Sequence, residues 1–434
     1  MAGRAVIMTS SERRAVVTGI GTVNPIGKDL ATCWDSLRQG KSGVHTIQNF
    51  DPAGLPVRFA GEVVNFDAKQ FVDKKDRKSL RMMARSIQLA VAAAQLALND
   101  SQAQIDDLDP TRFGVEFGAS LIASELEELG HASLVSANGQ PGIVDLGKWG
   151  SQGLSNIPPL WMLKYLPNML ACHISIMHNA QGPNNTITES DVAGMLAIGE
   201  AFRILRRNQA DYFLVGGAES RVNPLSMVRQ CLFQPLSKRN EEPTKASRPF
   251  DRQRDGMVLG EGASVLMLEE LNHAQKRKAK IYGELVGFGA AFDRGLTGRG
   301  LARAIRAALS EAEIEPQDID HINANGAGTI PGDVWEARGL HEIFGECRPA
   351  VPTFAAKSYF GNLGAGSGPT EILTSLLALK HGQLPATLNY QEPDPACPVT
   401  VTTGELRPIS KPYFLKTGFT ELGQCAAAVF RRWE

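Results

Sequence analysis

Short apolar runs alternate with amphipathic helical patterns along the first part of the chain. Strand-like runs occur at Ala15 to Thr18, in "RFGVEFGAS" and in "DYFLVGGAES". Helical patterns lie between them, because Ser86 to Asp100 is apolar and rich in small residues, and "VAGMLAIGEAFRILRRNQ" has one apolar face. Strands that alternate with helices are typical of layered α/β folds, so we predict that fold class.

The same alternation begins again near Lys280. A strand pattern, "AKIYGELVGFGAAF", is followed by the amphipathic helix pattern "GLARAIRAALSEAEI" and by a strand-like run from Ile319 to Ala324. A further helix, strand, glycine-rich loop and helix follow, and the chain closes with two strand-like runs. We therefore predict two halves of related layout, 13–275 and 276–434, which share one core because no low-complexity linker separates them.

One stretch has the layout of an active-site elbow: "GPNNTITESDVAGMLAIGEA", Gly182 to Ala201. A strand-like run, Thr186 to Thr188, stops abruptly, and a helix-like run from Val192 to Arg206 follows almost at once. The side chain at such a corner is the one that an enzyme presents to its substrate. Here that residue is Asp191.

Composition narrows the function classes. The chain has 434 residues, 43% of them hydrophobic, and a formal net charge of -1, so no global field favours nucleic acid or membranes. No apolar run reaches the roughly 20 residues of a membrane span. Residues 1–14 lack a long apolar core and read as a short extension before the first strand, so we expect a cytoplasmic protein. The basic run "DKKDRKSLR", Asp73 to Arg81, indicates a solvated loop or helix face rather than a docking patch.

Cysteine and histidine give no metal or disulfide pattern. The six cysteines lack CxxC pairs, which fits buried thiols in a reducing compartment. His173 and His178 have no cysteine or carboxylate at ligand spacing, so we interpret both as packed helix or loop residues rather than metal ligands.

Several long stretches resemble the β-ketoacyl-ACP synthase (condensing enzyme) family. They are "RRAVVTGIGTVNPIG", "DYFLVGGAES", "AAKSYFGNLGAGSGPTE" and, above all, Leu236 to Gly289. The resemblance covers the chain from Arg14 onward. It implies a thiolase-like α/β fold, a duplicated sandwich of five α-β-α-β-α layers.

The family's chemistry uses a nucleophilic cysteine and two histidines, and this sequence departs from all three. In the motif that resembles TACxSG, Asp191 stands where the family has cysteine. In the motifs that resemble xAHGTxTxxGD and KxxxGHxxGAAG, Asn325 and Asn362 stand where the family has histidine. The resemblance thus implies that Asp191, Asn325 and Asn362 occupy the three reacting positions.

These replacements do not suit carbon–carbon bond formation. A carboxylate at a helix N-terminus is stabilised as the anion, and its attack on a thioester would give a mixed anhydride that water destroys. Amides donate hydrogen bonds but do not shuttle protons near neutral pH, so Asn325 and Asn362 cannot act as the histidines do. The plainer interpretation is that Asp191 is an N-terminal helix cap and that both amides are hydrogen-bonding fillers of a polar pocket.

Other motif positions are kept. By resemblance, Lys357 and Glu371 match the family's structural lysine and its partner glutamate, and we interpret them as a buried ion pair. Thr329 matches one pantetheine-contacting threonine of the family, whereas Ala327 has replaced the other.

The family's C-terminal gating loop, GFGGTN, is changed to "FTELGQC", which begins at Phe419. Glu421 would place a charge where the family's gate is apolar. We therefore treat Phe419 and Glu421 as pocket residues whose character differs from that of the family.

Three functions follow from the resemblance, all in fatty acid or polyketide biosynthesis. The first is a non-condensing partner subunit similar to a chain length factor, which pairs with an active ketosynthase. The second is an enzyme with altered acyl-ACP chemistry, such as malonyl-ACP decarboxylation or thioester hydrolysis. The third is a homodimeric protein that binds acyl groups or acyl carrier protein. We expect a homodimer or heterodimer, no metal, and no cofactor beyond the phosphopantetheine of acyl carrier protein, itself a candidate partner.

Overall fold

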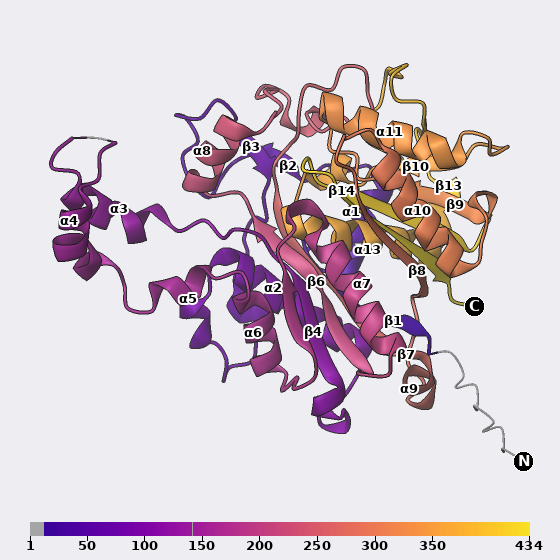
Figure 1. The fold of residues 1–434 in the computed structure, drawn as a ribbon, viewed down its shortest axis with the longest axis horizontal. Coiled ribbons are helices and arrows are strands. Elements are labelled where there is room, and N and C mark those ends of the chain that lie inside the picture. The colour runs from indigo at the N-terminus through magenta and orange to yellow at the C-terminus, as the bar shows by residue number, and fades with distance from the viewer. Residues whose placement is uncertain (1–12, 141) are drawn as a thin grey trace, which may run out of the picture.

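The computed structural model describes residues 13–140 and 142–434 (Figure 1). Most of the extension predicted at residues 1–14 therefore lies outside the described residues. The main sheet has eleven strands in the order β12-β10-β9-β14-β15-β8-β1-β7-β6-β4-β5. Its strands are β1 (Ala15–Val23), β4 (Phe113–Gly118), β5 (Asn184–Ile187), β6 (Tyr212–Ser220), β7 (Glu261–Glu270), β8 (Gly283–Phe292), β9 (Ile319–Asn323), β10 (Pro352–Phe354), β12 (Thr400–Val401), β14 (Tyr413–Phe419) and β15 (Gln424–Arg432).

Two small sheets and a set of helices complete the fold. The small sheets pair β2 (Val44–Thr46) with β3 (Phe59–Gly61) and β11 (Gln383–Leu384) with β13 (Arg407–Pro408). The α-helices are α1 (Leu30–Arg38), α2 (Arg85–Ser101), α3 (Leu126–Ser136), α4 (Leu146–Lys148), α5 (Trp161–Tyr165), α6 (Met169–Met177), α7 (Ala193–Arg206), α8 (Pro224–Phe233), α9 (Leu271–Lys276), α10 (Arg299–Ala312), α11 (Ile330–Phe344), α12 (Lys357–Phe360) and α13 (Ser367–His381).

The strand pairing repeats itself in the two parts of the chain. In the first part β4 runs parallel to β5 and β6, while β7 is antiparallel to β6 and β1. In the second part β9 runs parallel to β10 and β14, while β15 is antiparallel to β14 and β8. A short antiparallel contact between β1 and β8 joins the two sets. The layout is therefore duplicated, as the alternation of patterns predicts.

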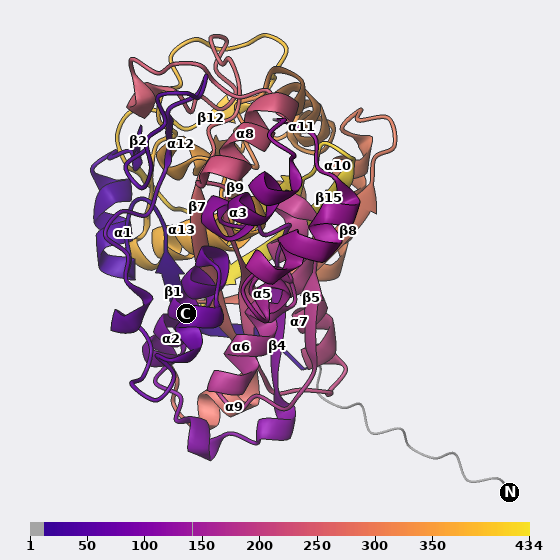
Figure 2. The same ribbon diagram turned by 90° about the vertical axis from the view of Figure 1, so that its left-hand side faces the viewer.

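Helices cover both sides of the strands and fill the space between the two sets. Helix α2 packs on β1, β6 and β7, and α10 packs on β8 and β15. Between the sets lie α7 and α13, which contact each other and strands of both halves (Figures 1 and 2). From Ser367 to Leu379 every residue of α13 is buried, and one hydrophobic cluster contains side chains from both halves. The five-layer arrangement thus has a single shared core.

The elbow is built by close contacts between backbones. Strand β5 ends at Ile187, a single 3-10 turn covers Ser190–Val192, and α7 begins at Ala193. Ser190 has a φ of 47°, a conformation that L-residues seldom adopt and that lets the chain reverse sharply. The predicted strand Thr186 to Thr188 is displaced, because the observed strand begins at the polar Asn184 and lies at the sheet edge.

Two glycines allow the backbones at the elbow to come into contact. A Cβ on Gly118, the last residue of β4, would lie 2.2 Å from the backbone nitrogen of Gly194. A Cβ on Gly194 would lie 2.5 Å from the carbonyl oxygen of Ala365. The end of a strand, the start of α7 and the loop before α13 are therefore in backbone contact, which fixes the position of Asp191.

Several sequence expectations outside the elbow can now be compared with the structure. All six cysteines are free, but Cys172 and Cys231 are only partly buried, so the expectation of six buried thiols is wrong for two of them. His178 is buried at the end of α6, and burial lowers its pKa to about 4. The basic run Asp73 to Arg81 consists of turns and one 3-10 segment.

Within residues 13–140 and 142–434, no helix is long and apolar enough to cross a bilayer, and no group of His, Cys, Asp or Glu could hold a metal ion.

The glycine contacts predict a stability effect. Gly118→Ala places a methyl group against the backbone of Gly194, which cannot move aside without shifting α7. We expect a loss of about 1–3 kcal/mol in the free energy of unfolding, as in other overpacked sites. Urea denaturation followed by circular dichroism measures it. Gly54→Ala is the matched control, because a Cβ there meets no atom within 4 Å; equal stability of the two variants would contradict the close contact.

Candidate functional site

A cavity of 260 Å³ lies at the elbow, between the two halves. Its wall is formed by the elbow, by α8, by the loop after β9 and by the turn between β14 and β15. It is lined by Ser120, Leu121, Glu189, Ser190, Asp191, Glu219, Arg221, Ser226, Arg229, Gln230, Gln234, Met257, Asn325, Ala327, Thr329, Gly332, Phe419, Thr420, Glu421 and Leu422. Most site residues predicted from the sequence line this cavity, whereas Asn362, Lys357 and Glu371 do not. Among the described residues that line it, none is a cysteine or a histidine.

Both carboxylate oxygens of Asp191 are engaged. Arg221 donates to Oδ1 at 2.8 Å, and the amide of Asn362 donates to Oδ2 at 2.7 Å. Burial works against the charged form, but the charges of Arg221 and Lys357 and both hydrogen bonds outweigh it, so the pKa of Asp191 is lowered. The carboxylate is therefore ionised and balanced. It is not the helix cap of the plainer interpretation, because α7 has Val192 at its N-cap and no side-chain cap hydrogen bond.

Arg221 is the partner that sequence reasoning missed. Its guanidinium lies between two carboxylates, since Nε also donates to Glu219 Oε1 at 2.7 Å. Glu219 in turn accepts from the backbone nitrogen of Ala365 at 2.9 Å, which ties this group to the loop before α13. The signal was present in "GGAESRV", where two opposite charges directly follow the apolar part of a strand. Only the fold reveals that Asp191 shares the same arginine.

Asn362 is held by bonds on both sides of its amide. Its Oδ1 accepts from the backbone nitrogen of Gly364 at 2.8 Å and from Ser367 Oγ at 3.1 Å. Its Nδ2 donates to Asp191 and lies 2.7 Å from Met257 Sδ. The amide is thereby fixed in one orientation, and its nitrogen is already engaged with Asp191 and Met257.

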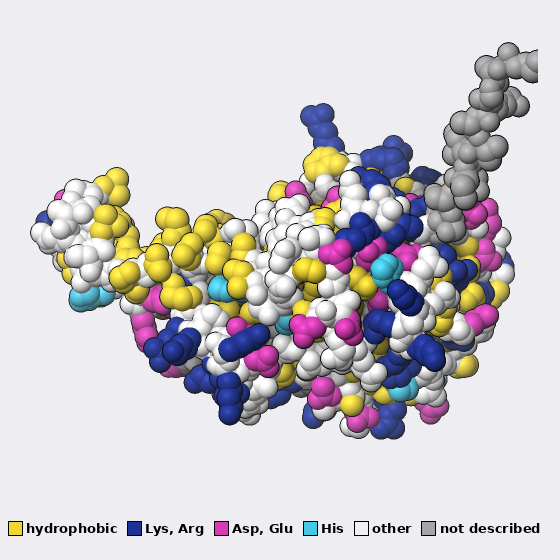
Figure 3. Space-filling view, turned by 90° about the horizontal axis from the view of Figure 1, so that it is seen from below, with side chains coloured by type: hydrophobic (Ala, Val, Ile, Leu, Met, Phe, Trp, Pro, Cys, Tyr) yellow, Lys and Arg dark blue, Asp and Glu magenta, His cyan; other side chains and the backbone are white. Residues whose placement is uncertain are grey.

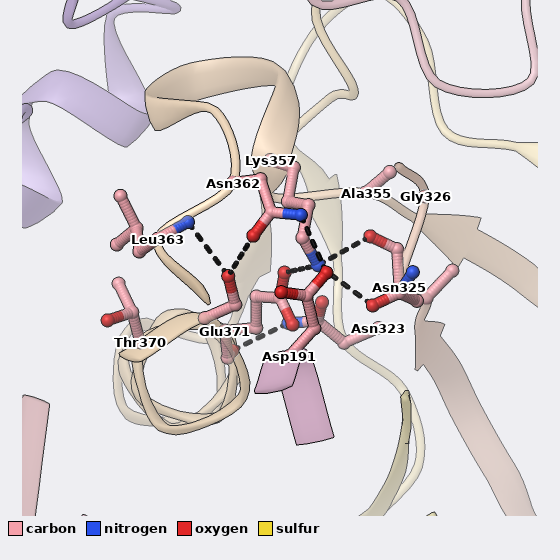
Figure 4. Close-up of polar contacts among 12 residues, drawn as sticks. Asp191, Asn323, Asn325, Gly326, Ala355, Lys357, Asn362, Leu363, Thr370 and Glu371 are labelled. Carbon is pink, nitrogen blue, oxygen red and sulfur yellow. Dashed lines mark hydrogen bonds and ion pairs between the residues drawn. The ribbon is translucent and has the colours of Figure 1, made fainter. Parts of the chain in front are cut away.

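Asn325 belongs to a second set of buried charges (Figure 4). Lys357 Nζ donates to Asn325 Oδ1 and to its carbonyl oxygen, each at 2.9 Å, and to Glu371 Oε1 at 2.5 Å. Lys416 Nζ reaches the other oxygen of Glu371 at 2.6 Å. Burial lowers the pKa of Lys416, and Glu371 opposes that effect. A lone lysine in the apolar strand "PYFLKTGF" was the sequence signal for this second partner.

The two amides therefore differ in what they offer a ligand. Asn362 has no donor to spare, whereas no described residue accepts from Asn325 Nδ2, so Asn325 can donate one hydrogen bond into the cavity. Its backbone is held by Glu336, which accepts from the nitrogen of Asn325 at 2.7 Å. An amide donor stabilises a developing oxyanion but does not transfer a proton.

The outer part of the cavity contains the remaining predicted residues. Thr329 and Ala327 face it from the loop before α11, and Phe419 ends β14 beside them. The carboxylate of Glu421 lies 3.1 Å from the side-chain amide of Gln234 when that amide is oriented to donate. Burial and the nearby charge of Asp191 raise the pKa of Glu421. Asp191 at the elbow and Glu421 in the outer part therefore both place a carboxyl group at the same cavity.

Two sequence profiles match the chain. The one described as "Beta-ketoacyl synthase, N-terminal domain" covers residues 12–274, and the one described as "Beta-ketoacyl synthase, C-terminal domain" covers residues 282–391. The first alone spans more than half of the chain. The chain belongs to the β-ketoacyl synthase family. The family resemblance and the thiolase-like fold expected from it are confirmed.

Relatives within the ketosynthase family match along the whole length. A 3-oxoacyl-[acyl-carrier-protein] synthase 2 from Synechocystis sp. is 35% identical over 98% of this chain and 99% of that protein. One of the same name from Vibrio cholerae is 34% identical over 97% of this chain and 100% of that protein.

Solved ketosynthase structures agree with the fold. "The ishigamide ketosynthase/chain length factor" superposes with a TM-score of 0.86 at 27% identity, over 98% of this chain and 100% of that one. A type II PKS acyl-carrier protein in complex with its ketosynthase gives a TM-score of 0.84 at 26% identity, with the same coverage of both chains.

The charge balance around Glu371 predicts a large loss of stability. Glu371→Gln leaves Lys357 and Lys416 buried against a neutral amide, and such an uncompensated charge costs about 3–5 kcal/mol. Urea denaturation at neutral pH measures the change. Glu242→Gln, which breaks the exposed pair with Lys245, is the control and should alter stability little. A Glu371→Gln variant as stable as this control would contradict the central role of the pair.

The surroundings of Asp191 predict how a thiol would behave there. In Asp191→Cys, Arg221 and Lys357 should favour the thiolate and lower the thiol pKa, so that iodoacetamide reacts faster than with the native cysteines. Burial raises the pKa of Cys33, Cys397 and Cys425 to about 12.

Glu189→Cys is the matched control, because it lines the same cavity but has no hydrogen bond to Arg221 among the described residues. The rate of alkylation against pH, followed by mass spectrometry, gives both thiol pKa values. A cysteine at position 191 that reacts no faster than free cysteine would mean that the elbow does not hold its side chain as described.

Proposed function

We propose that this protein is a non-condensing member of the ketosynthase family that acts, like a chain length factor, as the partner subunit of an active ketosynthase. The observation that carries the proposal is the state of Asp191. The residue at the elbow is a carboxylate already neutralised by Arg221 and hydrogen-bonded by Asn362. It offers a thioester no thiol and no adjacent base.

The rest of the cavity agrees with a lack of condensation. Binding of a malonyl group for decarboxylation would place a further carboxylate near Asp191 and Glu421, and like charges repel strongly in a poorly solvated site. Asn325 supplies one oxyanion donor, but a single amide without an imidazole leaves the proton transfers unassisted. Turnover by this subunit alone is therefore disfavoured at each step.

The comparisons support the choice of partner. One of the solved relatives is described as a ketosynthase/chain length factor, and another is a carrier protein in complex with its ketosynthase. By extension, this chain pairs with a ketosynthase of fatty acid or polyketide biosynthesis and meets the phosphopantetheine arm of an acyl carrier protein through that pair. Thr329 is the residue that we assign to contact with the arm.

Altered chemistry is the second candidate, and the free donor of Asn325 is the observation that favours it. The side-chain amide of this cavity-lining residue could stabilise the enolate that decarboxylation forms. This candidate predicts turnover by the chain on its own, which the first does not.

Co-purification separates the candidates. The tagged chain is co-expressed with each ketosynthase of its own organism that has an intact Cys-His-His set, and the purified material is assayed for release of carbon dioxide from malonyl-ACP. We expect a one-to-one complex with one such ketosynthase, condensation by the complex, and no turnover by the chain alone. The carrier-protein product is identified by mass spectrometry.

Two outcomes would overturn this assignment. The first is turnover by the chain alone that Asn325→Ala abolishes, which would establish the altered chemistry. The second is the absence of any complex, together with condensation that proceeds equally well without the chain. Thr329→Ala should leave the complex intact and weaken only the carrier-protein step.

A further inference from the structure

The cavity at the elbow has more carboxylates than cations. Among the described residues its lining includes four carboxylates and two guanidiniums, which belong to Glu189, Asp191, Glu219, Glu421, Arg221 and Arg229. Arg221 is shared between Asp191 and Glu219, so this group keeps one negative charge in excess. Lys357 and Lys416 do not line the cavity, and both are already paired with a carboxylate behind its wall. The cavity therefore has an unbalanced negative charge.

Glu421 adds to this excess. Its side chain has no cationic partner in the described part of the chain, and it lies 3.1 Å from the amide of Gln234 when that amide is oriented to donate. Partial burial and the charge of Asp191 raise the pKa of Glu421, so the two carboxylates are close enough to repel each other. Each oxygen of Asp191 accepts one hydrogen bond and can accept a second. A cation held between the two carboxylates would relieve the repulsion and find acceptors on both.

Three buried polar side chains of the lining have hydrogen-bonding groups that are not used. Ser226, Asn325 and Thr329 are 7%, 3% and 3% exposed. No hydrogen bond to a described residue engages Ser226 Oγ, Asn325 Nδ2 or Thr329 Oγ1, and these atoms open to the cavity rather than being sealed in the core. Buried polar groups without a partner cost free energy, so three of them at one cavity indicate a ligand.

The size of the cavity limits that ligand to a short group. Its volume of 260 Å³ is below the range of about 300–1,000 Å³ that is usual for ligand pockets. Leu121 and Leu422 in its lining are 60% and 80% exposed, and Figure 3 shows further apolar side chains along the helices that project to the left. Apolar surfaces hold methylene groups but do not distinguish acyl chains of equal length. Selectivity at the elbow must therefore come from the polar groups.

We propose that this cavity selects a short acyl group that ends in an ammonium, as in a β-aminoacyl thioester. The ammonium lies between Asp191 and Glu421 and donates a hydrogen bond to each carboxylate. The acyl carbonyl oxygen accepts from Asn325 Nδ2. Thr329 and Ser226 are left for the amide groups of the phosphopantetheine arm. An acyl group that ends in a carboxylate is excluded by the same charges.

This inference rests on the proposed function in one respect, which is that the acyl group arrives on a carrier arm. The charge selection belongs to this chain alone, so it is measured without a ketosynthase. A free amine is the other source of the same chemistry, and the test includes one.

Matched amide analogues of the thioester test the charge selection. N-acetylethylenediamine that carries a β-alanyl, a butyryl or a malonyl group gives three ligands with one common arm. The β-alanyl and butyryl groups have equal numbers of non-hydrogen atoms, because an ammonium replaces a methyl group. In isothermal titration calorimetry at neutral pH, we expect the β-alanyl analogue to have a dissociation constant about tenfold lower than that of the butyryl analogue. The malonyl analogue should bind most weakly. Propylammonium, the free amine, should bind less tightly than the β-alanyl analogue because it has no carbonyl group for Asn325.

Substitutions separate the two contacts. Glu421→Gln removes the charge but keeps a side chain that Gln234 can contact, so it should abolish the preference for β-alanyl and leave butyryl binding unchanged. Asn325→Ala should weaken both analogues by a similar factor. Glu189→Gln is the matched control, because this exposed side chain lines the same cavity but has no hydrogen bond or ion pair to a described residue; it should keep the preference. Circular dichroism and urea midpoints establish that each variant is folded.

The other outcomes are equally informative. Equal binding of the β-alanyl and butyryl analogues, or no binding of either, would overturn the inference and leave the proposed function standing. So would a preference that Glu189→Gln removes as fully as Glu421→Gln does, since it would not depend on the pair with Asp191. Propylammonium that binds as tightly as the β-alanyl analogue would overturn the assignment to an acyl group. The expected preference in a chain that never pairs with a ketosynthase would uphold the charge selection and remove the proposed function.

Discussion

The ion pair between Asp191 and Arg221 is the interaction on which the site depends. A carboxylate in a poorly solvated elbow is stable only beside a cation, and a buried guanidinium is stable only beside carboxylates. Arg221 meets both needs at once, because it joins Asp191 to Glu219 and, through Glu219, to the backbone of Ala365. The residue at the corner is therefore a structural member of its surroundings as well as the occupant of a catalytic position. Loss of Arg221 would leave both Asp191 and Glu219 without this cation, whereas loss of the Asp191 carboxylate would leave Arg221 paired with Glu219.

A second group of buried charges, centred on Glu371, lies near the first. Glu371, on the central helix α13, accepts from Lys357 and from Lys416, which come from α12 and β14. Lys357 then orients Asn325 through its side chain and its carbonyl oxygen. The wall of the cavity thus combines charged groups with the apolar side chains of Leu121, Met257, Phe419 and Leu422.

The sequence predicted most of the fold because its helices and strands carry clear periodicity. The duplicated halves, the elbow and the buried pair of Lys357 and Glu371 all followed from local patterns or from motif resemblance. Arg221 and Lys416 could not be placed in that way, since a residue distant in sequence reaches its partner only through the order of the strands. The predicted bounds of the edge strand were wrong because the observed strand begins at Asn184 and Asn185, which do not have the sequence pattern of a strand. The exposure of many apolar residues within 120–165 was not predicted, because helical periodicity alone does not tell which short helices pack on the core.

The conformation of Ser190 has a consequence for how such a protein arises. The unfavourable turn before the corner is maintained by backbone contacts among Gly118, Gly194 and Ala365, none of which involves the side chain at position 191. The geometry that presents a reactive group is thus encoded separately from the group itself. Side chains of different chemistry can therefore occupy position 191 without disturbing the turn that presents them, because Arg221 keeps Glu219 as its partner in each case.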